Sequence, residues 1–225
     1  MRTDHILQYL IDLRENNERE WYHAHKKEYQ QAQNDFEELI QELILKISEF
    51  DESIADKNPH DLTFKLVRDT RFSHDKSPYN PAFRTHIAKQ GKLPIPVGYY
   101  MMIKPGQSFI GGGLFADMFK DATTFVRDYL VEHPQEWQDV IKQLGDDLKV
   151  EGTALKKVPK GYDTESPVSE YLKYKSWYIE YPINDEIIRN PQLFLNTVVP
   201  LFKKMKILND YLNQALIDFR MPERK

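Results

Sequence analysis

Residues 97–113 read VGYYMMIKPGQSFIGGG, and the prediction of the fold rests first on this stretch. Residues 97–104 and 107–110 are rich in apolar and aromatic side chains, and Pro105-Gly106 separates them. Two such runs joined by a short turn-forming pair predict a β-hairpin. We therefore expect an antiparallel sheet in the middle of the chain.

The hairpin is followed by three glycines, Gly111, Gly112 and Gly113, and then by a predicted helix. Exposed N–H groups between a strand and a helix N-terminus attract anions, which makes Gly112 and Gly113 candidate ligand-binding residues. The stretch lacks the Gly-Lys-Ser/Thr ending of a P-loop and the spacing of a dinucleotide fingerprint. A bulge or close backbone packing is the alternative explanation.

Residues 1–52 are predicted to be helical, with apolar residues at helical spacing and a break at Asn16-Asn17. Asn17 and Glu20 form a capping-box pattern, which predicts that Asn17 starts a second helix. On that helix, Trp21 and Tyr22 are either core residues or the aromatic wall of a pocket.

The second half of the chain alternates between helical and extended patterns. We expect helices from Asp117 to about His133 and from Pro134 to about Leu144, extended pieces at 154–158 and 177–181 around a short helix at 169–174, and a final helix at about 192–219. Pro200 should kink or divide that last helix.

These patterns together predict an α+β protein, with helices at both termini packed on a mainly antiparallel central sheet. A chain of 225 residues can bury a full core, and we expect one domain. Its expected parts are helical residues 1–52, strand-rich residues 64–116 with a basic loop, helical residues 117–145, mixed residues 149–181 and a C-terminal helix at 190–219.

Positive charge is concentrated in residues 64–92, which carry seven basic and two acidic residues in a protein of net charge −4. Residues 64–73, FKLVRDTRFS, alternate in polarity and predict a partly buried strand, followed by a loop at Ser77-Pro78 and Asn80-Pro81. A buried guanidinium needs a carboxylate, a carbonyl or a ligand anion as its partner.

Two interpretations of this cluster stay open. In the first, Arg68, Arg71 and Lys76 form a cationic pocket for a phosphorylated or carboxylated small molecule, and the Tyr79 phenol donates to the same anion. In the second, the three cations and two carboxylates form an internal ion-pair network. A smaller basic island at residues 149–162 either is simply solvated or closes the pocket, with the candidates Lys156, Lys157 and Lys160.

Asp69, His74 and Asp75 are the candidates for acid–base chemistry in this segment. Two carboxylates could also hold a divalent metal such as Mg²⁺, although Asp69 lies between two arginines and suits a salt bridge better. His74 also fits an ordinary surface position. No histidine spacing predicts a zinc site, because His23 and His25 point to different sides of a helix.

The string RDTRFSHDKSPY at residues 68–79 resembles the signature of a conserved family of unknown function, found mainly in bacteria and also in fungi. The resemblance extends over most of the chain, from residue 16 to residue 176. It includes Asn16-Asn17, Glu20-Trp21-Tyr22, His25-Lys26, Gly98-Tyr99-Tyr100, residues 112–115, residues 155–162 and residues 172–176. Asn80 stands where the family often has lysine. The resemblance implies one domain and supplies no enzyme class, cofactor or substrate.

Composition narrows the remaining function classes. The chain has no cysteine, which excludes disulfides, thiolate metal sites and cysteine nucleophiles and fits a cytoplasmic protein. No apolar run is long enough for a membrane span. A nucleic-acid or protein-binding module is the competing class, with Phe72, Tyr79 and Phe83 stacking on bases, but a pI of about 6.0 argues against nucleic acid.

Overall fold

The computed structural model describes residues 2–222. In this part of the chain the strands form one four-stranded antiparallel sheet in the order β1-β2-β3-β4. The strands are β1 Phe83–Ile87, β2 Gly98–Ile103, β3 Ser108–Leu114 and β4 Trp177–Ile183. Strands β2 and β3 form the predicted hairpin. The α+β class is confirmed.

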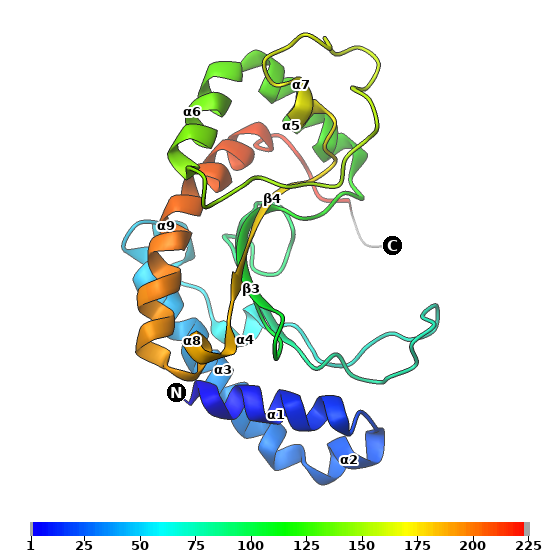
Figure 1. Ribbon diagram of the computed structural model, residues 1–225, viewed down its shortest axis with the longest axis vertical. Helices are drawn as coiled ribbons and strands as arrows, with labels where there is room; N and C mark the ends of the chain where they lie inside the picture. The colour runs from blue at the N-terminus through cyan, green and yellow to red at the C-terminus, as the bar shows by residue number, and fades with distance from the viewer. Residues whose placement is uncertain (1, 223–225) are drawn as a thin grey trace.

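Along the chain, helices precede β1, separate β3 from β4 and follow β4. In space they cover mainly one face of the sheet (Figure 1). They are α1 Thr3–Glu15, α2 Arg19–Ala24, α3 Lys26–Ser48, the 3-10 helix η1 Glu52–Ile54, α4 Pro59–Leu62, α5 Lys120–Glu132, α6 Pro134–Leu144, α7 Ser169–Leu172, α8 Asp185–Arg189 and α9 Pro191–Ala215. Helix α9 packs along β3, α1 packs on α3, and α6 packs on α9.

The period-two pattern of β2 explains which face is covered. Tyr99, Met101 and Ile103 are buried, whereas Tyr100 and Met102 are only partly buried. The Tyr99 ring meets Phe202 of α9 edge-on, with 5.3 Å between ring centroids. The buried residues of the hairpin therefore face the helices, as alternation along a strand requires.

The triple glycine lies inside strand β3, so its expected position between a strand and a helix is wrong. Gly113 has φ +103°, and a Cβ there would lie 2.4 Å from the carbonyl oxygen of Trp177. A Cβ on Gly112 would lie 3.2 Å from the Cβ of Met205 on α9. Close backbone packing, the alternative explanation, accounts for these glycines.

Three predicted elements in the second half differ from the structure, and the first two are α5 and the extended piece at 154–158. Helix α5 begins at Lys120 rather than Asp117, and its N-cap residue is Phe119. The Asp117 carboxylate accepts a hydrogen bond from Lys175 (3.3 Å) and does not cap the helix. Residues 154–158 form no strand, and only single bridges join Glu151 to Tyr178 and Ala154 to Tyr174.

The last helix, α9, ends at Ala215 rather than near residue 219 and runs unbroken through Pro200. It keeps its helical course because buried side chains on both sides of the proline, such as Val198 and Phe202, pack into the same core. Tertiary packing thus outweighs the lost backbone hydrogen bond.

No helix within residues 2–222 combines the length and the apolar composition needed to cross a bilayer.

Candidate functional site

Residues 67–79 form an arm that projects from the body of the protein just before β1 (Figure 1). The predicted strand at 64–73 is therefore wrong. At the base of the arm the Arg68 N–H donates to the Pro78 carbonyl (2.9 Å), and the Asn80 N–H donates to the Leu66 carbonyl (2.7 Å). Pro78 and Pro81 lack an N–H, so they cannot donate to the opposite segment, and the pairing stays limited to single bridges. The residues with alternating polarity, 64–73, thus lead into and form the first part of a long loop. We call residues 67–79 the basic arm.

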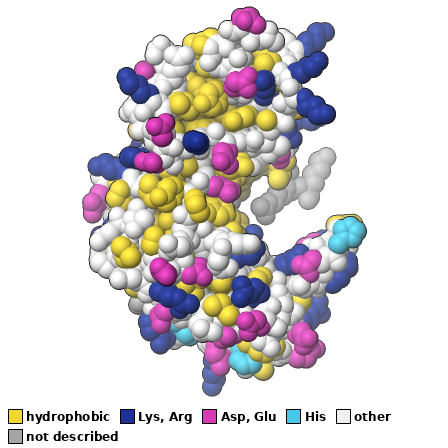
Figure 2. Space-filling model, in the orientation of Figure 1, with side chains coloured by type: hydrophobic (Ala, Val, Ile, Leu, Met, Phe, Trp, Pro, Cys, Tyr) yellow, Lys and Arg dark blue, Asp and Glu magenta, His cyan; other side chains and the backbone are white. Residues whose placement is uncertain are grey.

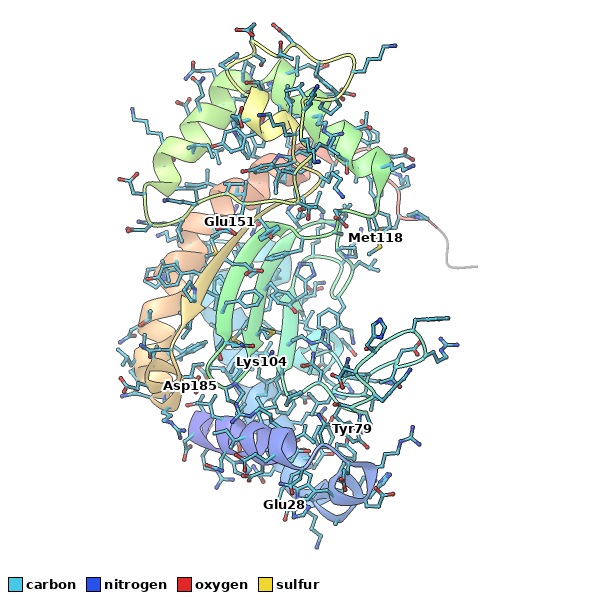
Figure 3. The ribbon with its side chains drawn as sticks, turned by 45° about the vertical axis from the view of Figure 1, so that its right-hand side comes forward. Glu28, Tyr79, Lys104, Met118, Glu151 and Asp185 are labelled. Atoms are coloured by element: carbon cyan, nitrogen blue, oxygen red, sulfur yellow. The ribbon has the colours of Figure 1, made fainter. Side chains whose placement is uncertain are left out.

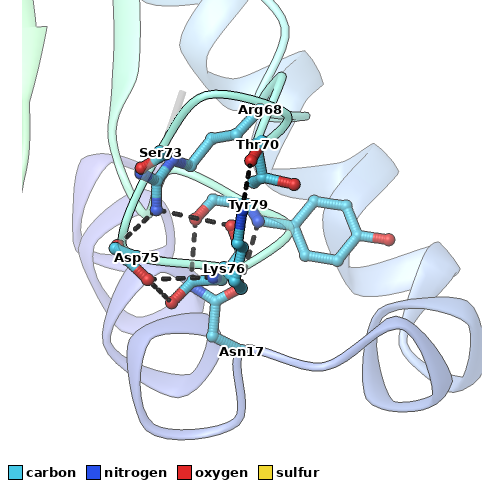
Figure 4. A network of polar contacts seen from close by, with 8 residues as sticks. Asn17, Arg68, Thr70, Ser73, Asp75, Lys76 and Tyr79 are labelled. Carbon is cyan, nitrogen blue, oxygen red and sulfur yellow. Dashed lines mark hydrogen bonds and ion pairs between the residues drawn. The ribbon is translucent and has the colours of Figure 1, made fainter.

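The base of the arm is fastened to the helical layer by Asn17. Its amide accepts a hydrogen bond from the Tyr79 N–H (3.1 Å) and donates one to the Tyr79 carbonyl (2.9 Å; Figure 4). The predicted capping role of Asn17 is wrong, since Glu18 is the N-cap residue of α2 and no side chain caps that end. An asparagine amide offers the same donor and acceptor as a peptide group, so it can pair with one residue as a strand would.

Arg68 is the centre of a polar network inside the arm. Its guanidinium forms an ion pair with Asp75 and donates to the Ser73 hydroxyl and the Ser77 carbonyl (3.3 Å each; Figure 4). The Asp75 carboxylate also accepts from the hydroxyl and the N–H of Ser77 (2.6 and 2.9 Å). These bonds from Ser77, followed by the Arg68 cation, lower the pKa of Asp75 far below its usual range. Asp75 is therefore ionised and holds Arg68 in place.

Arg71 and Lys76 lie farther out on the arm and are exposed. Figure 2 shows Lys and Arg side chains, in dark blue, along the projecting arm. The Arg71 side chain is 78% exposed and forms a fork-like pair with Asp69, with Nη2 to Oδ2 at 2.6 Å. This hydrogen bond lowers the pKa of Asp69. Lys76 donates to the Thr70 carbonyl (3.0 Å). The expectation that Arg71 is partly buried is wrong, because the segment is an exposed loop and not a strand.

One side of Arg68 opens into a cavity of about 370 Å³, which we call the basic groove. Its lining residues are Arg14, Asn17, Arg68, Asp75, Ser77, Tyr79, Asn80, Pro81 and Lys104. Arg14 lies in the last turn of helix α1, and Lys104 follows strand β2 at the lower end of the sheet (Figure 3). Neither cation forms an ion pair with another residue in the described range 2–222. The groove therefore has three cations and one carboxylate.

A second cavity, of about 510 Å³, lies on the other side of Arg68. It is lined by Arg19 and Lys76, but also by Glu18 and Glu20. Because acidic side chains there offset the added cations, the basic groove is the better candidate for an anion.

Several residues predicted from the sequence do not meet at this groove. Lys156, Lys157 and Lys160 belong to the segment beside α5 and α7, at the opposite end of the molecule from the arm (Figure 1). Gly112 and Gly113 lie in β3 against α9 and β4. The Tyr79 ring stacks on Tyr22 (4.2 Å between centroids) and points away from Arg68 and Asp75 (Figure 4). Its backbone, rather than its phenol, shapes the groove.

The residues considered for acid–base or metal chemistry are also separated. His74 is exposed on the arm, while Asp69 and Asp75 each pair with a different arginine. Within residues 2–222, no three side chains of the His, Cys, Asp and Glu types come together as a metal site would require. Two carboxylates with lowered pKa values do not suit proton transfer near neutral pH.

Sequence reasoning missed Arg14, Lys104 and the role of Asn17. The sequence around Arg14 indicates only a cation near a helix C-terminus, where it complements the helix dipole. The sequence around Lys104 indicates only a residue next to a turn. Only the folded chain brings both to Arg68. The position of Arg14 just before the Asn16-Asn17 break is the one local hint that it lies near the arm.

Fold and site together define an α+β protein with a cationic groove beneath a projecting polar arm. The chain belongs to the family described as "Conserved hypothetical protein (DUF2461)", which matches residues 5–211. This confirms the family resemblance found in the sequence. Comparisons with curated proteins and with solved structures gave no match.

Proposed function

We propose that this protein binds a phosphorylated or carboxylated small molecule in the basic groove. The observation that carries the proposal is the pair of cations without carboxylate partners in the described chain, Arg14 and Lys104, beside the oriented guanidinium of Arg68. Asp75 and the Ser73 and Ser77 groups fix that guanidinium before any ligand arrives. A preorganised donor loses little conformational entropy on binding, which favours this site over the surface lysines elsewhere.

Titration calorimetry with inorganic phosphate, pyrophosphate and citrate tests the proposal. We expect binding to the wild type, weakening as salt rises, and at least about a tenfold loss in the double variant Arg14→Gln/Lys104→Gln. The variant Lys142→Gln is the matched control, because Lys142 is an exposed cation on α6 without a partner in the described chain. If the double variant binds as tightly as the control, the groove is not the anion site.

A second candidate function rests on a different observation, the exposure of Phe72 at 94% on the basic arm. The guanidinium carbon of Arg71 lies 5.8 Å from the centre of this ring. An exposed aromatic beside a cation suits stacking on single-stranded nucleic acid. Tyr79 and Phe83, the other predicted stacking residues, are buried, so Phe72 would act alone.

Fluorescence anisotropy with a labelled single-stranded oligonucleotide distinguishes the two candidates. The nucleic-acid function predicts binding that Phe72→Ala weakens, whereas the small-anion function predicts none at physiological salt. The proposal also takes the chain as one cytoplasmic domain. Two observations support this: the buried side chains of residues 2–222 form one cluster, and the sequence has no cysteine.

A further inference from the structure

The face of the sheet turned away from the helices carries a group of partly exposed aromatic and methionine side chains. We call it the aromatic face, and its residues are Tyr100, Met102, Phe109, Phe115 and Tyr178. Tyr100 and Met102 alternate with the buried residues of β2, and the sheet register places Phe109 opposite Met102. In Figure 3 this face is seen in front of the helices, with Lys104 at the lower end of the strands and Glu151 near the upper end.

The rings of the aromatic face contact one another in a continuous row. Tyr100 lies between Phe109 and Phe115, with 5.6 and 5.4 Å between ring centroids, and Phe115 stacks on Tyr178 at 4.6 Å. Gly111 makes room for this row, because a Cβ there would lie 2.8 Å from the Phe115 ring. Since the rings already hold one another in place, they lose little conformational entropy when a further planar group packs on them.

The aromatic face continues into the basic groove through Lys104, which lines that groove. Lys104 comes directly after β2, and its carbonyl still accepts from the Gln107 N–H across the hairpin (2.8 Å). Two residues after Met102, it lies on the same face of the sheet. Phe109 is its diagonal neighbour, so the Cα atoms of the two residues lie roughly 7–8 Å apart. A single sugar between a phosphate and a base spans such a distance.

The charged groups on this face are of different sign on its two sides. Arg84 lies on the β1 side, where its guanidinium donates to the Lys65 carbonyl (3.3 Å). Glu180 lies in β4 and Glu151 pairs with the edge of that strand. Burial, together with the nearby Glu151 carboxylate, raises the pKa of Glu180. A second negative charge is therefore disfavoured beside β4, and the anionic end of a ligand belongs at Lys104.

We propose that the ligand of the basic groove is a mononucleotide, an inference that rests on the proposed function. Its phosphate lies among the cations of the groove, and its base stacks on Phe109 and Tyr100 of the aromatic face. A nucleobase is planar and uncharged, as this face requires, whereas a sugar phosphate without a base leaves the rings unused. A longer strand fits less well, because its further phosphates would meet the carboxylates beside β4.

Titration calorimetry with adenosine monophosphate, cytidine monophosphate, ribose 5-phosphate and inorganic phosphate tests this proposal. We expect at least one of the two nucleotides to bind about tenfold or more tightly than ribose 5-phosphate, because stacking of the base adds to the phosphate contacts. If ribose 5-phosphate binds as tightly as both nucleotides, the nucleotide inference fails while the proposed function stands. If none of the four compounds binds, the inference also fails, and binding of citrate alone would then leave only the proposed function standing.

The variant Phe109→Leu provides the second arm, since it removes a ring but keeps an apolar side chain. It should weaken binding of the nucleotide about tenfold and leave ribose 5-phosphate unchanged, and Phe109→Tyr should restore the nucleotide affinity. Phe125→Leu, the same change at a ring on α5 that is 38% exposed, is the matched control and should bind as wild type does. Equal nucleotide binding by folded Phe109→Leu and by the control overturns the assignment of the base to the aromatic face.

Discussion

Two loops of this protein are fastened by the same device and end up with opposite roles. The basic arm is held where Asn17 pairs with both backbone groups of Tyr79, and the loop at residues 88–97 is held where Asn213 pairs with both backbone groups of Val97. The arm projects into solvent, whereas the second loop lies against α9 and forms the wall of a cavity.

The two loops differ in the side chains that surround the fastened residue. Before Tyr79 the arm contains charged side chains that pair with one another and leave Phe72 exposed. Around Val97 the neighbours are apolar and buried, with Ile95 and Tyr99 among them. An asparagine clamp therefore fixes one residue's backbone, and the composition of the segment decides whether the rest packs or projects.

Breaking the clamp on the buried loop should have the largest effect on stability. Asn213→Ala leaves the N–H and carbonyl of Val97 without partners beside the cavity, and we expect a loss of about 2–4 kcal/mol in the free energy of unfolding. Urea unfolding followed by circular dichroism measures it. Gln214→Ala, an exposed neighbour, should stay within about 0.5 kcal/mol of wild type; a similar loss in both variants would show that the clamp contributes little.

The buried loop should also make stability depend on pH through His86, which packs beneath it. Burial lowers the pKa of His86 to about 4, against opposing contacts with the backbone of Leu93 and Gly91. The unfolded chain binds a proton near pH 6.5, while the folded chain does so only near pH 4. Stability is thus lost as pH falls from about 6.5 to 4, by up to about 3 kcal/mol from this residue.

Urea unfolding at pH 7, 6, 5 and 4 tests this sign. The difference in free energy of unfolding between wild type and His86→Gln should shrink by about 2–3 kcal/mol on going from pH 7 to pH 4. His74→Gln, on the exposed arm, should leave the pH profile of wild type unchanged. Parallel profiles for wild type and His86→Gln would contradict the buried neutral ring.

Breaking the other clamp should cost less. Asn17→Ala removes the same pair of bonds from Tyr79, but water can reach the arm and replace part of the loss, so we expect about 1–2 kcal/mol. Proteolysis of the native protein is the sharper measurement, since the released arm should be cut faster while β1–β4 stay protected. An unchanged cleavage rate would mean that the Tyr22–Tyr79 stack alone holds the arm.

These contrasts show what the sequence could and could not predict. The hairpin at residues 97–110 was predictable because its signal is local, with two apolar runs around Pro105-Gly106. The basic arm was not, because FKLVRDTRFS has the alternation of a strand, and only the prolines at 78 and 81 argue against pairing.

The residues of the candidate site also fall into a group that the sequence could predict and a group that it could not. Arg68 and Asp75 lie close in sequence, and their cluster was visible there, although the structure pairs each arginine with its own carboxylate. Arg14 and Lys104 come from distant elements, and nothing in their own segments reveals that they line a groove with Arg68. Long-range contacts set by packing are the part of a site that spacing alone does not encode.

The smallest expected effect on stability concerns Arg71 on the arm, and it tests directly whether the arm is exposed in solution. A buried guanidinium that lost its carboxylate would destabilise the protein strongly, whereas Arg71 and Asp69 are both exposed and paired in solvent. We therefore expect Arg71→Ala to melt within experimental error of wild type. Arg127→Ala is the contrasting variant, because Arg127 is buried and donates to the carbonyls of Leu172 and Tyr174 (2.8 and 2.6 Å). Its midpoint of thermal unfolding should fall by several degrees as these carbonyls lose their donors. If Arg71→Ala destabilised the protein as much as Arg127→Ala, the arm would have to be packed in solution, and the contrast between the two loops would be lost.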